Sequence, residues 1–352
     1  MLINKEIEEV LRHYHYDFSQ VVIATLGNGH INDTYKLSTP NNNFVLQKIN
    51  HHVFTNPLQL SKNTQLINQY LVDTDYPLLV PQQLQTKNGD YVVKTKQNYW
   101  RLMEYIEDSY SVEKVSTPKE AELVARSFAM FSSALSHFST ESLSVIIPNF
   151  HDIEFRLSQL REAIKNSKAN RLNSCQELTE FCFAQQSFIN EVVELSSKLP
   201  LRVTHNDTKI NNLLFSKVDN NPCAVIDLDT CMPGLIMHDF GDMVRTCCSN
   251  LEEDDGNVSA MQFQFDIFEA LITSYQKSFG TALSPLEKES LVVGARLLPF
   301  IIGVRFLTDY INGDVYFHCS RENHNLDRAK NQFQLFNLVS KATSELKRLI
   351  EC

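Results

Sequence analysis

Residues 201–245 read LRVTHNDTKINNLLFSKVDNNPCAVIDLDTCMPGLIMHDFGDMVR. A short apolar segment, typical of a buried strand, leads into His205 and Asp207, and Asn212 follows five residues after Asp207. Two further apolar segments with a polar turn between them indicate a β-hairpin, and the second of them ends at Asp227. The pattern is therefore His-x-Asp-x4-Asn, a hairpin, and Asp.

These residue types are the ones that phosphoryl transfer from ATP requires. Asp207 is expected to accept the proton of the attacking hydroxyl, and Lys209 to reach the γ-phosphate. Mg²⁺ prefers oxygen ligands and keeps several waters, so Asn212 and Asp227 fit a magnesium site. Asp229 is a further candidate for the metal shell. The segment predicts a kinase with ATP as co-substrate and Mg²⁺ as cofactor.

A polar turn followed by a buried acidic pair is the alternative that involves no catalysis. Asp and Asn are common in turns, so His-x-Asp alone is a weak signal. The complete set in this order, flanked by apolar strands, favours the catalytic interpretation. Within it, His205 is expected to orient the loop backbone rather than to touch substrate.

A second acidic motif, Asp239-Phe240-Gly241, is similar to the metal-binding motif of protein kinases. Asp239 lies 32 residues after Asp207, beyond a Pro-Gly turn, so Asp227 has the better spacing for a metal ligand. Asp239 and Asp242 are therefore expected to cap a helix or to brace the catalytic loop. The motif Gly-x4-Gly-Lys-[Ser/Thr] does not occur in the sequence, which excludes a P-loop enzyme.

Length and charge narrow the class of protein. The chain has 352 residues, which is enough for two lobes, and 42 acidic against 32 basic residues give a net charge of −10. Such an acidic chain is a poor nucleic-acid binder.

The longest apolar run, 291–307, is broken by Gly, Pro and two Arg, so no membrane span is expected. The N-terminus has no apolar signal core, which indicates the cytoplasm. A monomer is the default.

Eight cysteines are spread from residue 175 to residue 352 without a Cys-x-x-Cys pair. In a cytosolic protein such cysteines are expected to be reduced and to serve as small buried apolar residues. A zinc site is the less favoured interpretation.

The first hundred residues predict short strands and one helix. Expected strands are 21–26, 34–37, 44–49, 91–93 and 100–106, and the expected helix is 57–71. From Thr117 onward the composition becomes helical, beginning with a capping box at Thr117-Pro118-Lys119-Glu120 and continuing through 150–200, 258–280 and 284–311. We therefore expect an α+β protein with a small β-rich N-lobe (1–102), a hinge (103–108) and a larger helical C-lobe (109–352).

The chain resembles the aminoglycoside phosphotransferase and choline kinase superfamily, which has a two-lobed, protein-kinase-like fold. The resemblance rests on 27–35 (GNGHINDTY), 201–214, 226–234 with 239–245, and 305–317 (RFLTDYINGDVYF). Within the superfamily it is similar to the N-acetylhexosamine 1-kinases. The resemblance implies that ATP phosphorylates the anomeric hydroxyl of N-acetylglucosamine or N-acetylgalactosamine. It also implies a sugar site at His30, Asp207, Arg305 and Tyr316, with magnesium at Asn212 and Asp227.

The N-lobe departs from the protein-kinase pattern. The strand position that usually carries a lysine is Gln47, and Lys48 points to the other face of a strand of period two. The helix position that usually carries its glutamate is Gln65, so a Gln47–Gln65 hydrogen bond is expected in place of the ion pair. Gly27 and Gly29 of the Gly-x-Gly turn, with Gln47, Met103 and Tyr105, are the predicted nucleotide-binding residues.

Two other functions remain open. The first is the same chemistry on another acceptor, such as an aminoglycoside, a choline-like amine or homoserine. The second is a non-catalytic nucleotide-binding protein, which the missing Lys–Glu pair would suit. The complete set of Asp207, Asn212 and Asp227 favours an enzyme.

Overall fold

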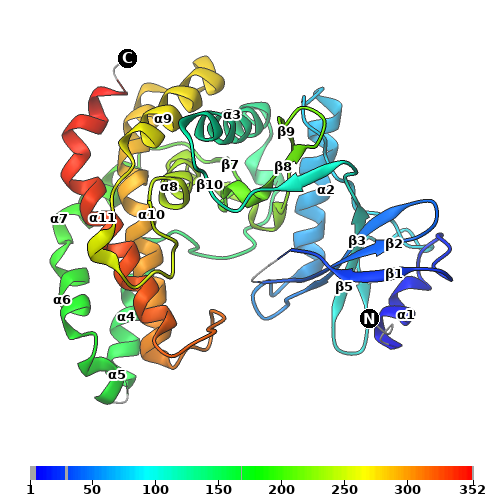
Figure 1. Cartoon of the computed structure of the whole chain (residues 1–352), viewed down its shortest axis with the longest axis horizontal. Helices are drawn as coiled ribbons and strands as arrows, with labels where there is room; N and C mark the ends of the chain where they lie inside the picture. The colour runs from blue at the N-terminus through cyan, green and yellow to red at the C-terminus, as the bar shows by residue number, and fades with distance from the viewer. Residues whose placement is uncertain (1–4, 28–30, 168, 351–352) are drawn as a thin grey trace. The chain divides into compact units, whose positions relative to one another are not determined.

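The computed structural model describes residues 5–27, 31–167 and 169–350. The chain forms two compact units, which are described separately. Unit 1 comprises residues 1–111, 137–148 and 214–232, and unit 2 comprises residues 112–136, 149–213 and 233–352. Unit 1 carries most of the strands and unit 2 most of the helices (Figure 1), so the predicted α+β class is confirmed.

Unit 1 is built on a five-stranded antiparallel sheet in the order β1-β2-β3-β5-β4. Its strands are β1 (Val22–Thr25), β2 (Asp33–Ser38), β3 (Asn43–Ile49), β4 (Val93–Lys94) and β5 (Tyr99–Glu104). Phe44 and Leu46, two residues apart on β3, are buried, as the two-residue period of a strand requires, and Leu46 pairs with the buried Leu102 of β5. Helix α1 (Lys5–Leu11) adds Ile7 and Val10 to this core.

The remaining elements of unit 1 are one long helix and a small sheet. Helix α2 (Pro57–Asp73) begins with Asn56 as N-cap and Pro57 at its first position. The small sheet has the order β6-β8-β9, with β6 (Ser109–Ser111), β8 (Leu213–Ser216) and β9 (Pro222–Val225). The 3₁₀ turn η3 (Leu228–Thr230) follows β9 closely; Asp227 is its N-cap and Asp229 lies within it.

Unit 2 is mainly helical. Its helices are α3 (Pro118–Ala134), α4 (Ile153–Asn166), α5 (Ala169–Asn173), α6 (Gln176–Ala184), α7 (Gln186–Ser196), α8 (Ile236–Cys247), α9 (Phe265–Phe279), α10 (Pro285–Asn312) and α11 (His324–Arg348). The predicted capping box at Thr117 and Glu120 is present, and Ser284 with Glu287 forms a second one. The helix expected from residue 258 begins only at Phe265, because Phe263 forms a β-bridge to Ser249.

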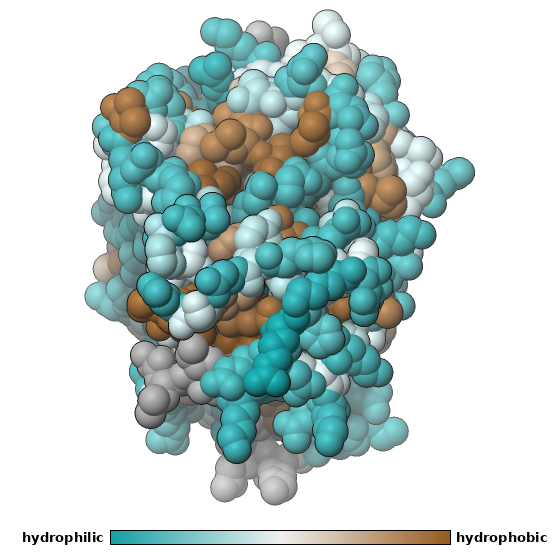
Figure 2. All heavy atoms as spheres, turned by 90° about the vertical axis from the view of Figure 1, so that its right-hand side faces the viewer, coloured by the Kyte–Doolittle hydropathy of each residue, from teal (hydrophilic) through white to brown (hydrophobic). Residues whose placement is uncertain are grey.

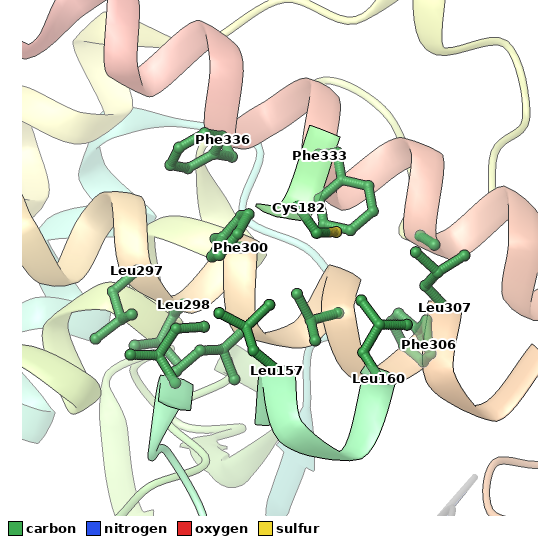
Figure 3. Close-up of a cluster of buried hydrophobic side chains, with 14 of the residues drawn as sticks. Leu157, Leu160, Cys182, Leu297, Leu298, Phe300, Phe306, Leu307, Phe333 and Phe336 are labelled. Atoms are coloured by element: carbon green, nitrogen blue, oxygen red, sulfur yellow. The ribbon is translucent and has the colours of Figure 1, made fainter. Parts of the chain in front are cut away.

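Helix α10 is the central helix of unit 2. Figure 3 shows its side chains Leu297, Phe300 and Leu307 packed among residues of α4, α6 and α11. The helix is long and apolar enough to cross a membrane, but 78% of its most apolar window is buried inside the protein. Burial of this kind is what a core helix of a globular protein requires.

Two glycines let α8 and α10 approach closely. A Cβ atom at Gly241 of α8 would lie 2.2 Å from the carbonyl oxygen of Gly294 on α10. A Cβ atom at Gly294 would lie 2.0 Å from the carbonyl oxygen of Met237. Because a side chain at either position would force the backbones apart, this crossing fixes the depth of α8 in unit 2.

The face shown in Figure 2 is mainly hydrophilic, with hydrophobic areas between the polar side chains. Of the cysteines in the described residues, Cys175, Cys182, Cys231, Cys247 and Cys248 are buried, while Cys223 and Cys319 are partly buried. All seven are unpaired thiols, as predicted.

Candidate functional site

The predicted catalytic loop lies in unit 2, directly after strand β7 (Arg202–Thr204). Asp207 forms an ion pair with Lys209, with 2.8 Å between Oδ1 and Nζ. The amide nitrogen of Asn212 donates to the Asp207 carbonyl oxygen (2.8 Å) and to its Oδ2 (2.9 Å). The loop therefore brings together three of the predicted site residues and leaves the Asp207 side chain 27% exposed.

Electrostatics keep Asp207 ionised. Burial alone would raise its pKa, but the Lys209 ammonium and the Lys209 and Asn212 hydrogen bonds outweigh that effect, and its pKa lies below the usual 3.8. Lys209 has a raised pKa, because the Asp207 charge outweighs the effect of burial. At neutral pH the pair is a carboxylate that can accept a proton next to an ammonium.

Asp239 braces the backbone of this loop from helix α8. Its carboxylate accepts hydrogen bonds from the amides of His205 (2.9 Å) and Asn206 (2.7 Å). The Thr208 hydroxyl donates to the Asp239 carbonyl oxygen at 2.6 Å. Of the two predicted roles of Asp239, bracing is the one that the structure confirms.

The buried setting of Asp239 changes its acidity. Burial, with the nearby charges of Asp242 and Asp207, raises the pKa of Asp239 to about 7 despite the two backbone hydrogen bonds. Asp242 is paired instead with Arg245, whose Nε lies 2.8 Å from its Oδ1.

His205 is fully buried, and its ring packs against Phe128 and Phe131 of α3, with ring centroids 5.4 and 5.8 Å away. Asn206 adopts the left-handed region, with φ of 63°. These contacts agree with a role for His205 in orienting the loop.

The predicted metal ligands are carried by both units. Asn212 uses its amide nitrogen for Asp207, which leaves its Oδ1 as the candidate ligand atom. In unit 1, Asp227 follows strand β9 in the left-handed region (φ 61°) and begins η3. Across the residues that the structure describes, no cluster of three or more His, Cys, Asp or Glu residues could hold a metal. Mg²⁺ needs only one or two protein ligands, so an amide and a carboxylate oxygen suit it.

Asp229 is already paired inside unit 1. Its Oδ1 lies 2.7 Å from Nη2 of Arg101, and its Oδ2 accepts from the Asn32 amide at 2.7 Å. The side chains of Asp229 and Arg101 are each only 2% exposed. These contacts favour a structural role for Asp229 over a place in the metal shell.

The same network includes Gln47. Its Oε1 accepts from Nε (3.0 Å) and Nη2 (2.6 Å) of Arg101, which is its register partner on β5, and its amide donates to Thr34. Lys48, which alternates with Gln47 along the strand, pairs with Asp33, a contact that the sequence did not predict.

The predicted Gln47–Gln65 hydrogen bond is wrong. Gln65 donates to Ser61 of its own helix, four residues earlier, because Gln47 is fully engaged by its strand neighbours. Arg101, which contacts both Gln47 and Asp229, was not predicted from the sequence. The available signal was an arginine inside the apolar strand YWRLME at the position opposite Gln47.

The other predicted nucleotide-binding residues lie in unit 1. Gly27 has a φ of 70° after β1. Met103 of β5 pairs with Val45 and forms a β-bridge to Gln83. The Lys36 ammonium lies 3.9 Å from the ring centroid of Tyr105. Gly29 and His30 lie outside the described residues.

The predicted acceptor residues of unit 2 lie together. The Arg305 guanidinium on α10 lies over the rings of Phe150 (5.1 Å), Phe317 (5.4 Å) and Tyr316 (5.7 Å). Tyr316 is 50% exposed. Asp309 holds the segment that carries it, because its carboxylate accepts the amides of 315, 316 and 317 at 2.8–3.0 Å. Arg305 also interacts electrostatically with Asp207.

Solved structures share this fold over nearly the whole chain. An aminoglycoside phosphotransferase from Alicyclobacillus acidocaldarius is 12% identical with a TM-score of 0.65, over 100% of this chain and 97% of that chain. A choline kinase from Streptococcus pneumoniae is 12% identical with a TM-score of 0.58, over 95% and 99%. A Plasmodium vivax ethanolamine kinase is 14% identical with a TM-score of 0.56, over 89% and 82%.

The sequence itself matches a family model. Residues 22–267 match the model described as the phosphotransferase enzyme family. The matched region is more than half of the chain and contains the catalytic loop, the hairpin and Asp239. The chain therefore belongs to the phosphotransferase enzyme family.

Proposed function

We propose that the protein is a small-molecule kinase that phosphorylates the anomeric hydroxyl of an N-acetylhexosamine with ATP. The observation that carries the kinase chemistry is Asp207, a carboxylate held ionised by Lys209 and Asn212 on a loop that Asp239 braces. The cluster of Arg305 and Tyr316 supports a hydroxyl-rich acceptor, because guanidinium and phenol groups donate hydrogen bonds to such a molecule.

In the proposed reaction the acceptor oxygen attacks the γ-phosphorus and the bond to the ADP oxygen breaks. Asp207 takes the proton that the acceptor hydroxyl loses, and Lys209 faces the charge of the transferred group. Asn212 and Asp227, which flank the β8–β9 hairpin in the chain, would hold Mg²⁺. Bound Mg²⁺ would screen the phosphate charges.

We further propose the division of labour expected from the sequence. Residues 1–102 carry the nucleotide-binding residues Gly27, Gly29 and Gln47, and the hinge at 103–108 carries Met103 and Tyr105. Residues 109–352 carry catalysis and acceptor binding. His30 would complete the acceptor site. A cytoplasmic monomer suits this activity.

A coupled ADP-release assay tests the proposal. The panel contains N-acetylglucosamine, N-acetylgalactosamine, glucose, galactose, glucosamine, choline and kanamycin, and phosphorus NMR identifies the product. An acid-labile anomeric phosphate from an N-acetylhexosamine is the expected result. Turnover of choline or kanamycin alone would replace the acceptor and keep the Asp207 chemistry. ATP binding without turnover of any compound would favour the non-catalytic alternative.

A further inference from the structure

An aromatic cradle in unit 2 is already filled by a protein cation. Phe150, Tyr316 and Phe317 surround the Arg305 guanidinium at 5.1–5.7 Å, within the range of cation–π attraction. Three rings in this arrangement are the kind of site that binds ammonium ligands. Because Arg305 occupies it, a cationic acceptor cannot use these ring faces.

A second guanidinium lies close to the first without a carboxylate partner. Arg156 of α4 donates to the Phe150 carbonyl oxygen (3.2 and 2.9 Å) and to Gln159 (2.9 Å). Within residues 5–27, 31–167 and 169–350, neither Arg156 nor Arg305 has a carboxylate within 4.0 Å. Burial lowers the pKa of both arginines; the Arg305 charge lowers that of Arg156 further, and the Arg245 charge lowers that of Arg305 further.

Two negative groups also act on this pair of arginines. Asp207 interacts with Arg305 but is already paired with Lys209. Asp152 interacts with Arg156 but is exposed and caps the first turn of α4. The local balance is therefore an excess of positive charge, which repels an ammonium group and favours oxygen acceptors.

A buried histidine adds hydrogen-bonding capacity at the same place. His151 is only 9% exposed, and its ring lies 4.4 Å from the Phe150 ring and 4.9 Å from the His238 ring. The Asn206 carbonyl is near the ring, yet neither ring nitrogen of His151 has hydrogen-bond geometry to any described residue. A buried imidazole without an aligned partner is costly, and a polar atom of a ligand would complete it.

We propose, on the basis of the kinase activity proposed above, that Arg156, Arg305, His151 and His238 form an acceptor subsite that selects uncharged, oxygen-rich acceptors and rejects ammonium-bearing ones. His151 is a specificity residue of this subsite and hydrogen-bonds an oxygen of the acceptor. This selectivity is opposite to what aminoglycoside, choline and ethanolamine acceptors would need.

The test compares two acceptors that differ in charge. N-acetylglucosamine and glucosamine share the same ring, but at pH 6.5 the glucosamine amine is protonated. The wild-type protein is expected to favour the acetylated sugar at least 100-fold in kcat/KM, and glucose over glucosamine at least 10-fold. In Arg305→Gln both ratios should fall at least 10-fold. Arg296→Gln is the matched control. Arg296 lies on α10, as Arg305 does, but it stacks on Phe188 of α7 and pairs with Glu191.

The outcomes separate the subsite from the proposed function. Turnover of only an uncharged compound other than an N-acetylhexosamine would contradict the proposed function and support the subsite. A preference for glucosamine, choline or kanamycin over the uncharged sugars would overturn the subsite. The subsite would also be overturned if the kcat/KM ratios of uncharged to charged sugars were the same in wild type and in Arg305→Gln.

His151→Phe tests the specificity residue, because the change keeps a ring and removes both nitrogens. The expected result is about a 3- to 10-fold higher KM for the acceptor, the size of one hydrogen bond, with the KM for ATP unchanged. The melting temperature should be unchanged or higher, because a buried polar group without a partner is lost. A lower melting temperature with an unchanged acceptor KM would show that His151 is only structural.

Discussion

Asp207 has two neighbours that define its chemistry, the Lys209 ammonium and the Asn212 amide. Asp207→Asn keeps the shape of the side chain but removes the proton acceptor. We expect a fall of about 10²–10⁴-fold in kcat, the usual contribution of a general base, with ATP binding retained. Single-turnover kinetics and calorimetric titration with ATP measure the two quantities.

Asp219 offers the matched control, because it is an exposed carboxylate in the β8–β9 turn that accepts hydrogen bonds from Asn221. Asp219→Asn should leave kcat unchanged. Near-normal turnover in Asp207→Asn would refute the assignment of the base.

The sequence predicted the local elements around the site. The spacing from His205 to Asn212 predicted the loop, and the polar turn between two apolar segments predicted the β8–β9 hairpin, because both patterns are local in the chain. The bracing role of Asp239 was one of two options, and only its hydrogen bonds to the amides of His205 and Asn206 decide between them.

At the scale of elements, the Arg101–Asp229 pair ties the main sheet of unit 1 to η3. Arg101→Met leaves the Asp229 carboxylate buried without its cation, which should lower the free energy of unfolding by about 3–5 kcal/mol. The double variant Arg101→Met with Asp229→Asn should recover part of that loss, because the unpaired charge is gone. Urea unfolding of the single and double variants measures the coupling.

Lys48→Met is the control on the neighbouring strand, because the side chains of its pair with Asp33 are 34% and 54% exposed and such a pair contributes little to stability. A loss in Lys48→Met as large as that in Arg101→Met would contradict the assigned role of the buried pair.

The sequence could not predict this pair. Strand periodicity indicates which face Arg101 occupies, but the partner lies 128 residues away along the chain, beyond the reach of any local pattern. By comparison with the Lys and Glu positions of protein kinases, Gln47 was expected to bond to Gln65. The strand register places Arg101 opposite Gln47 instead.

A second link between elements is the glycine contact of α8 and α10. Gly294→Ala places a Cβ atom 2.0 Å from the Met237 carbonyl, so α8 must shift and carry Asp239 with it. We expect kcat to fall at least 10-fold and the melting temperature to fall as well. Gly313→Ala is a control for the loss of glycine, because its Cβ would meet open space and only its φ of 101° is unfavourable. If Gly294→Ala retained full turnover, the loop would not depend on this crossing.

At the scale of the whole molecule, two histidines and one aspartate make stability depend on pH in opposite directions. Burial lowers the pKa of His238 to about 4, and burial with the charges of His238 and Arg305 lowers that of His151. Below pH 6.5 these two histidines bind protons in the unfolded chain but not in the folded chain. The free energy of unfolding therefore decreases as the pH is lowered. Asp239 has a pKa of about 7 in the folded protein, so it is protonated there before it is protonated in the unfolded chain. Its protonation therefore stabilises the folded protein as the pH falls from 7 toward 4.

The measurement is the free energy of unfolding at pH 7.5 and 5.5 for wild type, His238→Phe and Asp239→Asn. Relative to wild type, His238→Phe should lose about 1 kcal/mol less on acidification, and Asp239→Asn should lose more, because its compensating gain is absent. Identical pH dependence in the three proteins would contradict these assignments.

The general plan of the molecule followed from its sequence, because strand and helix periodicities change near residue 117 and the capping box marks the change. The arrangement of the acceptor cluster did not. Phe150, Arg305 and Tyr316 come from separate segments, and only the packed core of unit 2 brings them together.

The aromatic cradle that Arg305 fills has an evolutionary consequence. Kinases for amines and kinases for neutral sugars need not differ in scaffold or in catalytic loop, because one arginine can block the rings that an amine would use. A lineage that lost Arg305 would expose Phe150, Tyr316 and Phe317 in a single mutational step. Ancestors and descendants on either side of that step would bind different metabolites while keeping the same chemistry.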